Sequence, residues 1–314
     1  MTKKHCYLAA GLLMTKSVLI IGGNGYIGSK LIYDLHNTYN IHSVDICWFN
    51  TPDAHIEVRD YRQLTKQDLS KYDAVVLLAG HSSVKMCDGP VLASWINNVN
   101  NFINLVSKLD KSQTLIYASS GSVYGSGNTT SIEDVTLQFK PINNYDLTKY
   151  SLDVQAERFI KDGYKIIGLR FGTVNGWSPN LREELMINSM TKKSLYDNTI
   201  SINNKTITRP ILGINDISRA VVAIVETPIS GIYNLASFAD TVENISGCVS
   251  KLLNANIQET INVSGAYDFI MDTRKFERTY NFKFNESVES IVNEIVNKFE
   301  KTNFTNRNNF IKYE

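Results

Sequence analysis

The stretch that most constrains the fold is an apolar run leading into three evenly spaced glycines. Residues 18–21 are followed by Gly22, Gly25 and Gly28, and the segment 29–35 is compatible with a helix. Glycine lets the backbone turn sharply and approach a ligand closely, because it has no Cβ. The free N–H groups and positive dipole end of the following helix suit a diphosphate. The stretch therefore predicts a strand, a tight phosphate-binding turn and a helix.

The composition is that of an ordinary globular protein. The chain has 314 residues, of which 43% are hydrophobic and 20% are charged, and its formal net charge is +1. A charge this close to zero gives no reason to expect nucleic acid or an anionic membrane surface as a partner. The apolar runs are shorter than the roughly 20 residues that a membrane-spanning helix needs. We therefore expect neither nucleic acid nor a membrane as a partner.

The cysteines and histidines form no recognisable pattern. The four cysteines show no Cys-x-x-Cys spacing and the five histidines are scattered. Free thiols in a reducing compartment and no metal site are therefore expected, which favours a cytoplasmic location. Residues 1–13 carry two lysines and a short apolar run, and we interpret them as a disordered extension, with Met14 as an alternative natural start.

The first half of the chain alternates between strand and helix patterns. Continuous apolar runs, typical of buried parallel strands, alternate with helical spacing. This pattern predicts an α/β fold with a doubly wound parallel sheet of the Rossmann type, which binds ligands outside the carboxyl ends of its strands. The expected strands are 17–21, 39–44, 56–60, 73–80, 114–118 and 165–171, and the expected helices include 95–109 and 145–162.

The second half predicts a smaller lobe for the substrate. A turn-rich segment over 172–179 leaves the sheet, a helix is expected over 181–190, and 200–202 with 206–208 predicts a hairpin. A strand over 231–235 returns to the sheet. The expected division is a dinucleotide domain from 14–174 and 211–236, a substrate lobe from 175–210 and 237–300, and a tail over 301–314.

An acidic residue at a strand end indicates the cofactor. The strand over 39–44 ends in Asp45, 17 residues after Gly28. Near this distance, dinucleotide folds hold the adenosine ribose hydroxyls with a carboxylate. A carboxylate accepts hydrogen bonds from a diol and repels a 2′-phosphate, so Asp45 favours NAD over NADP. Ala79 and Gly80, small residues at another strand end, let a flat cofactor lie against the backbone.

A tyrosine and a lysine at the start of a predicted helix supply acid–base chemistry. Tyr145 and Lys149 lie four residues apart, on one helix face. A lysine cation near a phenol lowers the pKa of the phenol, so that the phenolate can take a proton from a substrate hydroxyl. Ser120, at a strand end, can share that proton. Tyr26 and Lys30 repeat the spacing inside the glycine-turn helix, so the spacing is informative only together with the other motifs.

In their order and spacing these motifs resemble the extended short-chain dehydrogenase/reductase family, the NAD-dependent epimerases and dehydratases of nucleotide sugars. The resemblance covers about residues 17–300. The matching pieces are Gly22–Gly28, Leu78–Gly80, Asn98–Val99, Ser119–Ser120 with Val123–Gly125, Tyr145 with Lys149, Leu169–Phe171, Arg209–Ile211 with Asp216, and Tyr233–Leu235.

The resemblance implies a role for each site residue. Ser120, Tyr145 and Lys149 would be the catalytic triad, and Asp60 would touch the adenine side of the cofactor. The implied substrate-binding residues are Ser120, Thr173 and Arg209, the last of which lies where the family contacts the nucleotide. The implied cofactor-binding residues are Gly22, Gly25, Tyr26, Ile27, Gly28, Asp45, Asp60, Leu78, Ala79, Gly80, Asn98, Tyr145 and Lys149.

Departures from the family pattern narrow the reaction. Sugar 4,6-dehydratases carry an Asp-Glu pair directly after the catalytic Ser or Thr, where this chain has Gly121 and Ser122. Without these carboxylates, loss of water lacks its proton shuttle, and the related decarboxylases are disfavoured too. Thr173 stands where Asn is common in the family, which changes the anchoring of the substrate at that point.

The sequence thus predicts NAD-dependent oxidation of a ring hydroxyl, at C4, on a nucleotide-activated sugar. Return of the hydride to the other face of the keto sugar would make the enzyme an epimerase, the reading we favour. Release of the keto sugar would make it a dehydrogenase, a 4-keto reductase is a third alternative, and a non-catalytic NAD-binding regulator is a fourth. The helices over 95–109 and 145–162 form the dimer interface in relatives, so a homodimer is expected.

Overall fold

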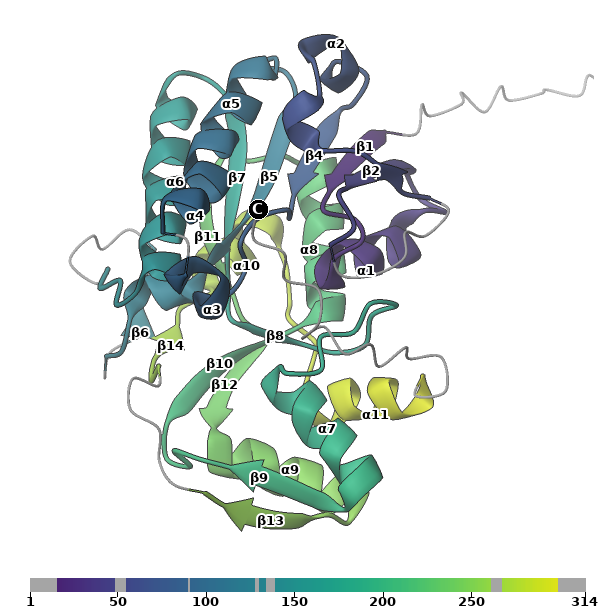
Figure 1. The fold of residues 1–314 in the computed structure, drawn as a ribbon, viewed down its shortest axis with the longest axis vertical. Coiled ribbons are helices and arrows are strands. Elements are labelled where there is room, and N and C mark those ends of the chain that lie inside the picture. The colour runs from purple at the N-terminus through teal and green to yellow at the C-terminus, as the bar shows by residue number, and fades with distance from the viewer. Residues whose placement is uncertain are drawn as a thin grey trace, which may run out of the picture.

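The centre of the molecule is a seven-stranded parallel sheet, which confirms the predicted fold class. The computed structural model describes residues 16–48, 55–89, 91–127, 130–133, 139–260 and 267–298, so the predicted extension over 1–13 and tail over 301–314 lie outside the described residues. The strand order is β11-β7-β5-β4-β1-β2-β3, and each of these pairings is parallel (Figure 1). The strands are β1 (Ser17–Ile21), β2 (Asn40–Asp45), β3 (Glu57–Val58), β4 (Ala74–Leu77), β5 (Thr114–Ser120), β7 (Lys165–Phe171) and β11 (Gly231–Leu235).

Strand β1 shows why helices cover both faces of the sheet. Its side chains alternate between two hydrophobic cores, Val18 and Ile20 entering one and Leu19 and Ile21 the other. A strand buried on both faces is apolar throughout, as the sequence is here. The covering helices are α1 (Tyr26–Leu35) and α8 (Ile214–Glu226) on the first core, and α5 (Asn101–Lys108) and α6 (Asn144–Lys161) on the second (Figure 1).

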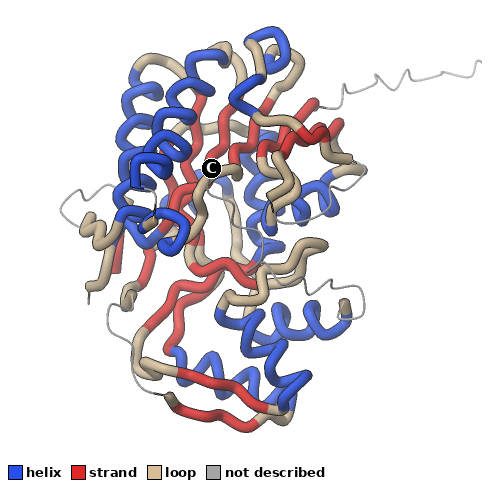
Figure 2. The backbone as a smooth tube through the Cα atoms, viewed as in Figure 1, coloured by secondary structure: helices blue, strands red, loops and turns tan. Residues whose placement is uncertain are grey.

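A smaller lobe with its own core lies beyond the carboxyl ends of the sheet strands (Figure 2). It holds a three-stranded sheet of order β12-β10-β8 and the parallel pair β13-β9. Trp177 is buried in the core of this lobe. The lobe elements are β8 (Thr173–Asn175), α7 (Met186–Asp197), β9 (Thr199–Ile202), β10 (Thr208–Gly213), β12 (Phe238–Thr241), α9 (Val242–Leu253), β13 (Asn256–Glu259) and α11 (Val288–Asn297).

Local predictions in the second half were partly wrong. The hairpin of 200–202 with 206–208 does not form, because β9 pairs in parallel with β13, whereas β10 pairs with β8 and β12. The helix expected over 181–190 begins only at Met186. Hydrogen bonding of strands to partners far along the chain has overridden the local pattern in this lobe.

The helix expected over 95–109 is interrupted. It consists of α4 (Val91–Trp95), a π-helical turn over Ile96–Asn100 and α5. A π turn inserts one residue into the helical spacing and is frequent at functional sites. Here the turn carries Asn98, a buried residue whose amide reaches toward the end of β4.

Part of the range predicted for the lobe packs on the sheet domain instead. Phe276 of α10 (Arg274–Tyr280) is fully buried in the first core, and its ring lies 5.7 Å from that of Tyr233 on β11. Tyr280 adds a second aromatic contact to the same tyrosine. The segment around α10 therefore belongs to the sheet domain by packing, because the aromatic surface that it buries lies there.

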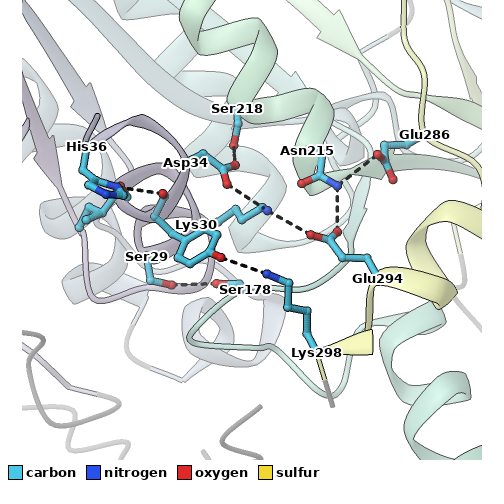
Figure 3. Close-up of polar contacts among 12 residues, drawn as sticks. Ser29, Lys30, Asp34, His36, Ser178, Asn215, Ser218, Glu286, Glu294 and Lys298 are labelled. Carbon is cyan, nitrogen blue, oxygen red and sulfur yellow. Dashed lines mark hydrogen bonds and ion pairs between the residues drawn. The ribbon is translucent and has the colours of Figure 1, made fainter. Parts of the chain in front are cut away.

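A polar network ties the glycine-turn helix to the last helix of the lobe (Figure 3). Lys30 of α1 is almost fully buried, and its Nζ lies 3.1 Å from Asp34 Oδ1 and 3.2 Å from Glu294 Oε1 on α11. The Ser218 hydroxyl of α8 contacts Asp34, and the Asn215 amide donates to Glu294 at 2.8 Å. Three helices from distant parts of the chain therefore share one buried cation.

The remaining described elements are short. Helices α2 (Lys66–Leu69) and α3 (Val84–Asp88) follow β3 and β4, and β6 (Thr130–Ser131) pairs in parallel with β14 (Ile270–Met271). Short 3-10 turns cover Tyr61–Gln63 and Gly121–Tyr124. Within the described ranges, no helix is long and apolar enough to cross a membrane.

Candidate active site

A cavity of about 460 Å³ lies where the strand ends of the sheet face the lobe. It collects side chains from the ends of β1, β2, β4 and β5, from the start of α6 and from β8 and β10 of the lobe. Asn98 is the predicted site residue that does not line it. Those that line it are Gly22, Gly25, Tyr26, Ile27, Gly28, Asp45, Asp60, Leu78, Ala79, Gly80, Ser120, Tyr145, Lys149, Thr173 and Arg209.

The glycine turn has no room for side chains. Gly22 adopts a φ of 94°, and a Cβ there would lie 2.6 Å from the backbone N of Ala79. A Cβ on Gly28 would lie 2.2 Å from the carbonyl oxygen of Gly22. Gly25 is the N-cap of α1, whose first N–H groups therefore face the turn. This is the cradle that a dinucleotide diphosphate needs.

Two acidic side chains, Asp45 and Asp60, line the cavity. Asp45 accepts hydrogen bonds from the backbone N–H groups of Asn24 at 3.0 Å and Cys47 at 2.7 Å. Burial raises the pKa of the Asp45 carboxyl, and these amides oppose the shift. Asp60 caps the following 3-10 turn and accepts a hydrogen bond from Arg62 Nε at 2.7 Å, so Asp60 and Arg62 act there as a pair.

Asn98 acts behind the cavity wall. Its Oδ1 accepts from the backbone N of His81 at 2.8 Å, and its Nδ2 donates to Thr148 Oγ1 at 3.1 Å. A Cβ on Gly80 would lie 2.8 Å from the same Oδ1. Asn98 therefore joins the end of β4 to the helix that carries Tyr145, without contacting the cavity itself.

The proposed triad meets at the centre of the cavity. Ser120 ends β5, and its Oγ lies 2.8 Å from Ser122 Oγ. Lys149 Nζ donates to the carbonyl oxygen of Ala118 at 2.8 Å and lies 5.8 Å from the centre of the Tyr145 ring. The register of β5 and the first two turns of α6 thus bring a serine, a phenol and an ammonium together.

The electrostatics of the triad differ from the expectation that Lys149 makes Tyr145 acidic. Burial raises the pKa of the Tyr145 phenol, and the groups that most oppose this are the Ser120 hydroxyl and the Arg182 guanidinium. Burial also lowers the pKa of Lys149, to about 8. Because Lys149 is itself desolvated and bonded to a carbonyl, its charge is a weak local influence on the phenol in this structure.

The lobe side of the cavity presents a guanidinium. Arg209 of β10 donates from Nη2 to Thr173 Oγ1 of β8 at 3.0 Å, and burial lowers its pKa. Among the described residues, Arg209 Nε has no hydrogen-bond partner, and the buried Ser119 Oγ and Asn97 Oδ1, also at the cavity, have none either. Buried polar atoms are normally paired, so these three atoms fit a cavity that binds a polar ligand.

Sequence reasoning missed several residues of the cavity wall. Arg182 and Leu185 come from the loop before α7, and Tyr267 and Phe269 come from the segment before β14. Arg182, which follows the turn-rich segment, could have been found as a cation near a predicted substrate loop. Tyr267 gives no local signal, because its place depends on packing against helix α6, more than a hundred residues earlier. Within the described parts, no cluster of His, Cys, Asp or Glu is arranged to hold a metal ion.

Comparison with known proteins agrees with this geometry. The sequence model of the NAD dependent epimerase/dehydratase family matches residues 18–236. The chain belongs to this family. NAD is accordingly its cofactor, and the glycine turn, Asp45 and the unpaired polar atoms fit that group.

Several known proteins resemble this chain in sequence or in fold. Protein CapI of Staphylococcus aureus is 27% identical over 68% of this chain and 70% of its own, and ADP-L-glycero-D-manno-heptose-6-epimerase of Brachyspira hyodysenteriae is 28% identical over 52% and 56%. This chain thus spans little more than half the length of some curated relatives. Among solved structures, UDP-glucuronic acid 4-epimerase from Bacillus cereus, in complex with UDP-glucuronic acid and NAD, has a TM-score of 0.78 at 22% identity, covering 91% and 99% of the two chains. At that identity the likeness shows the fold alone.

Proposed function

We propose that this protein is a nucleotide-sugar 4-epimerase that uses NAD. The observation that carries the proposal is the shared cavity, which joins the glycine turn and Asp45 to Ser120 and Tyr145 and continues to Arg209 of the lobe. One end thus suits a dinucleotide, the middle holds acid–base groups, and the far end offers a cation for a second phosphorylated ligand. The proteins similar in sequence include the UDP-glucose 4-epimerases of Lactobacillus helveticus and Mycoplasma pneumoniae, which supports this proposal.

Each residue has a defined task in this mechanism. NAD, when bound, supplies the acceptor for a hydride from the sugar carbon. Tyr145 exchanges a proton with the ring hydroxyl, and the Ser120 hydroxyl contacts the Tyr145 phenol beside it. Lys149 holds the end of β5 through Ala118 and lines the cavity together with Tyr145. Arg209 attracts the diphosphate of the sugar nucleotide.

Dehydration is disfavoured by the packing as well as by the sequence. A Cβ on Gly121 would lie 2.5 Å from Met271 Sδ and 3.2 Å from Phe269 Cε2. The first of the two positions where dehydratases carry carboxylates is therefore closed by the segment around β14. Ser122, at the second position, lines the cavity but cannot act as a carboxylate.

A panel of UDP-, GDP- and dTDP-sugars tests this function. Purified protein with NAD is incubated with each sugar, products are separated by chromatography, and absorbance near 340 nm reports NADH. Product without net NADH supports an epimerase, whereas stoichiometric NADH would indicate a dehydrogenase. Tyr145→Phe is expected to lower turnover by roughly a hundredfold or more, the range of acid–base catalysis. Tyr196→Phe, an exposed tyrosine on α7, is the matched control and is expected to turn over normally.

We also propose that the protein forms a homodimer through α4 and α6. Val91, Leu92 and Ile96, around α4, and Leu147 and Val154, on α6, are exposed although they are apolar. Both helices lie on the same side of the sheet in Figure 1. Contiguous exposed apolar surface marks association sites. Leu92→Glu with Val154→Glu should convert a dimer to a monomer in light scattering, and a wild-type monomer would refute the proposal.

A further inference from the structure

A carboxylate lies directly behind the proposed triad. Asp146, the residue after Tyr145, is completely buried. Its Oδ2 accepts hydrogen bonds from the backbone N of Ile142 at 3.1 Å and the hydroxyl of Tyr267 at 2.8 Å. In the part of the chain that the structure describes, its hydrogen-bond donors are neutral groups. It lies in the first turn of α6, where the positive end of the helix dipole and these donors stabilise its charge without a cation, so it is available as an ionised proton acceptor.

A row of hydroxyl groups connects this carboxylate to Tyr145. The Ser122 hydroxyl interacts with the Asp146 carboxylate and favours its charged form. Ser122 Oγ in turn lies 2.8 Å from Ser120 Oγ, and the Ser120 hydroxyl interacts with the Tyr145 phenol. Tyr145, Ser120 and Ser122 line the cavity, whereas Asp146 does not.

The direction of these contacts is fixed by chemistry. An ionised carboxylate can only accept, so Ser122 donates to Asp146. Ser122 can then accept a hydrogen bond from Ser120, and Ser120 can accept one from the neutral Tyr145 phenol. Every donor in the row thus points from Tyr145 toward Asp146. This orientation is the one that lets a proton move along the row by successive short transfers.

The packing around Gly121 fixes the segment beside the row. Met271 and Phe269 close the space beside Gly121, and β14 is held there by its pairing with β6. Tyr267, from the same segment, binds both oxygens of Asp146, at 2.8 and 3.0 Å. The segment before β14 thus both covers the carboxylate and fixes its orientation.

We propose that Asp146 takes up the proton that the sugar hydroxyl loses, acting through Ser122, Ser120 and Tyr145 as a positioning residue and proton store. This inference rests on the proposed function. As the hydride leaves the sugar carbon for the acceptor which that function requires, the hydroxyl proton passes to Tyr145. The protons of Tyr145, Ser120 and Ser122 each move one place along the row. The carboxylate becomes a carboxylic acid and each hydroxyl keeps one proton.

Storage of the proton suits an epimerase. The same proton returns to the sugar oxygen when the hydride returns to the other face, so the enzyme ends the reaction in its starting protonation state. Burial raises the pKa of the Asp146 carboxyl, which makes it a better proton acceptor than an exposed aspartate. Among the described residues, the titratable groups that interact with it are Tyr145, on its own helix, and Tyr267, from the segment before β14.

The kcat of Asp146→Asn distinguishes a proton-relay role of Asp146 from a purely electrostatic role. The negative charge of Asp146 raises the pKa of Tyr145, so a purely electrostatic role predicts that its removal makes Tyr145 more acidic and the oxidation faster. The relay predicts the opposite, a kcat at least tenfold lower with KM little changed. Ser122→Ala, which leaves the carboxylate in place, should show the same loss, and the double variant should lose no more. A faster Asp146→Asn enzyme, or a Ser122→Ala enzyme with normal kcat, would overturn the proposal.

The pH profile gives a second kinetic readout. The carboxylate must be ionised to accept the proton, so wild-type kcat should fall as the pH drops below the pKa of Asp146. Tyr267→Phe removes a donor to the carboxylate, which raises that pKa and moves the acid limb to higher pH. Asp146→Asn should remove this limb. An acid limb that is unchanged in Tyr267→Phe argues against the relay.

Titration of the Asp146 carboxyl without substrate tests the inference independently of the proposed function. In protein labelled with ¹³C at the aspartate carboxyls, the Asp146 resonance is the one missing from Asp146→Asn. Its midpoint should exceed the ordinary value of about 3.9 and should rise further in Ser122→Ala. If Ser122→Ala does not change the titration midpoint of Asp146, Ser122 does not contact the carboxylate and the relay is refuted. If the wild type converts none of UDP-glucose, UDP-glucuronic acid and UDP-N-acetylglucosamine while the midpoint behaves as expected, the proposed function fails and the hydroxyl row stands.

Discussion

Substitution of Gly28 by alanine would increase helix propensity but would also place a Cβ where there is no space for it. Gly28 lies in the first turn of α1, where alanine would by itself stabilise the helix by about 1 kcal/mol. However, the new Cβ would lie 2.2 Å from the Gly22 carbonyl oxygen, and this gap must open by 1.2 Å to reach the 3.4 Å of ordinary contact. The nearest neighbours of this Cβ are backbone atoms of the turn, which cannot move aside as a flexible side chain would.

We therefore expect Gly28→Ala to destabilise the protein and to weaken NAD binding. Overpacking of this kind costs about 1–3 kcal/mol, which outweighs the gain in propensity and leaves a net loss of about 1 kcal/mol. The same distortion moves the turn N–H groups away from the diphosphate, so the Kd for NAD should rise at least about tenfold, or 1.4 kcal/mol. Urea unfolding and calorimetric titration with NAD measure the two effects.

Gly247 provides the matched control. It lies in the middle of helix α9, is exposed, and a Cβ there would meet nothing within 4 Å. Gly247→Ala should therefore stabilise the protein by about 0.5–1 kcal/mol and leave NAD binding unchanged. A Gly28→Ala protein that gains stability like the control, with an unaltered Kd for NAD, would refute the assignment of the turn as a close-packed phosphate cradle.

Three further predictions concern buried charges. Lys30→Met leaves the carboxylate of Glu294 without its cation and should cost roughly 3 kcal/mol in urea unfolding, part of which Glu294→Gln should restore if the network is as described. Asp153→Asn breaks a buried ion pair with Arg170, whose Nε lies 2.7 Å from the carboxylate, and should cost about 3–5 kcal/mol; a loss below about 1 kcal/mol would contradict its burial. Because burial lowers the pKa of Lys149 to about 8, the unfolded chain binds more protons above that pH, so stability should rise from pH 8 toward about 10. Lys149→Met should flatten this rise when unfolding is measured across that range.

The sheet could be predicted because its strands are buried on both faces. Strands such as β1 and β4 are apolar along almost their whole length, and that signal is local. Since parallel strands end at one edge, the residues after them, such as Asp45 and Ser120, were expected to meet there. The structure places both at the cavity.

Parts that depend on distant packing could not be predicted. The pairing of β9 with β13 and the burial of Phe276 against β11 arise between segments with no local signal for one another. The same holds for Asp146, which at the start of a helix is an ordinary helix-stabilising residue. Only the segment that brings Tyr267 over it shows that the carboxylate is buried behind Tyr145.

The shared cation of Lys30 also has a consequence for how the chain is made. Lys30 and Glu294 are separated by 264 positions, so the helix that follows the phosphate turn leaves the ribosome long before its partner exists. At about 5–20 residues per second, the delay is roughly 10–50 s. During that time the ammonium of Lys30 has to stay hydrated or rely on Asp34, and α1 cannot be fully buried. The cofactor site is therefore completed late in synthesis, although most of its residues are among the first to be translated.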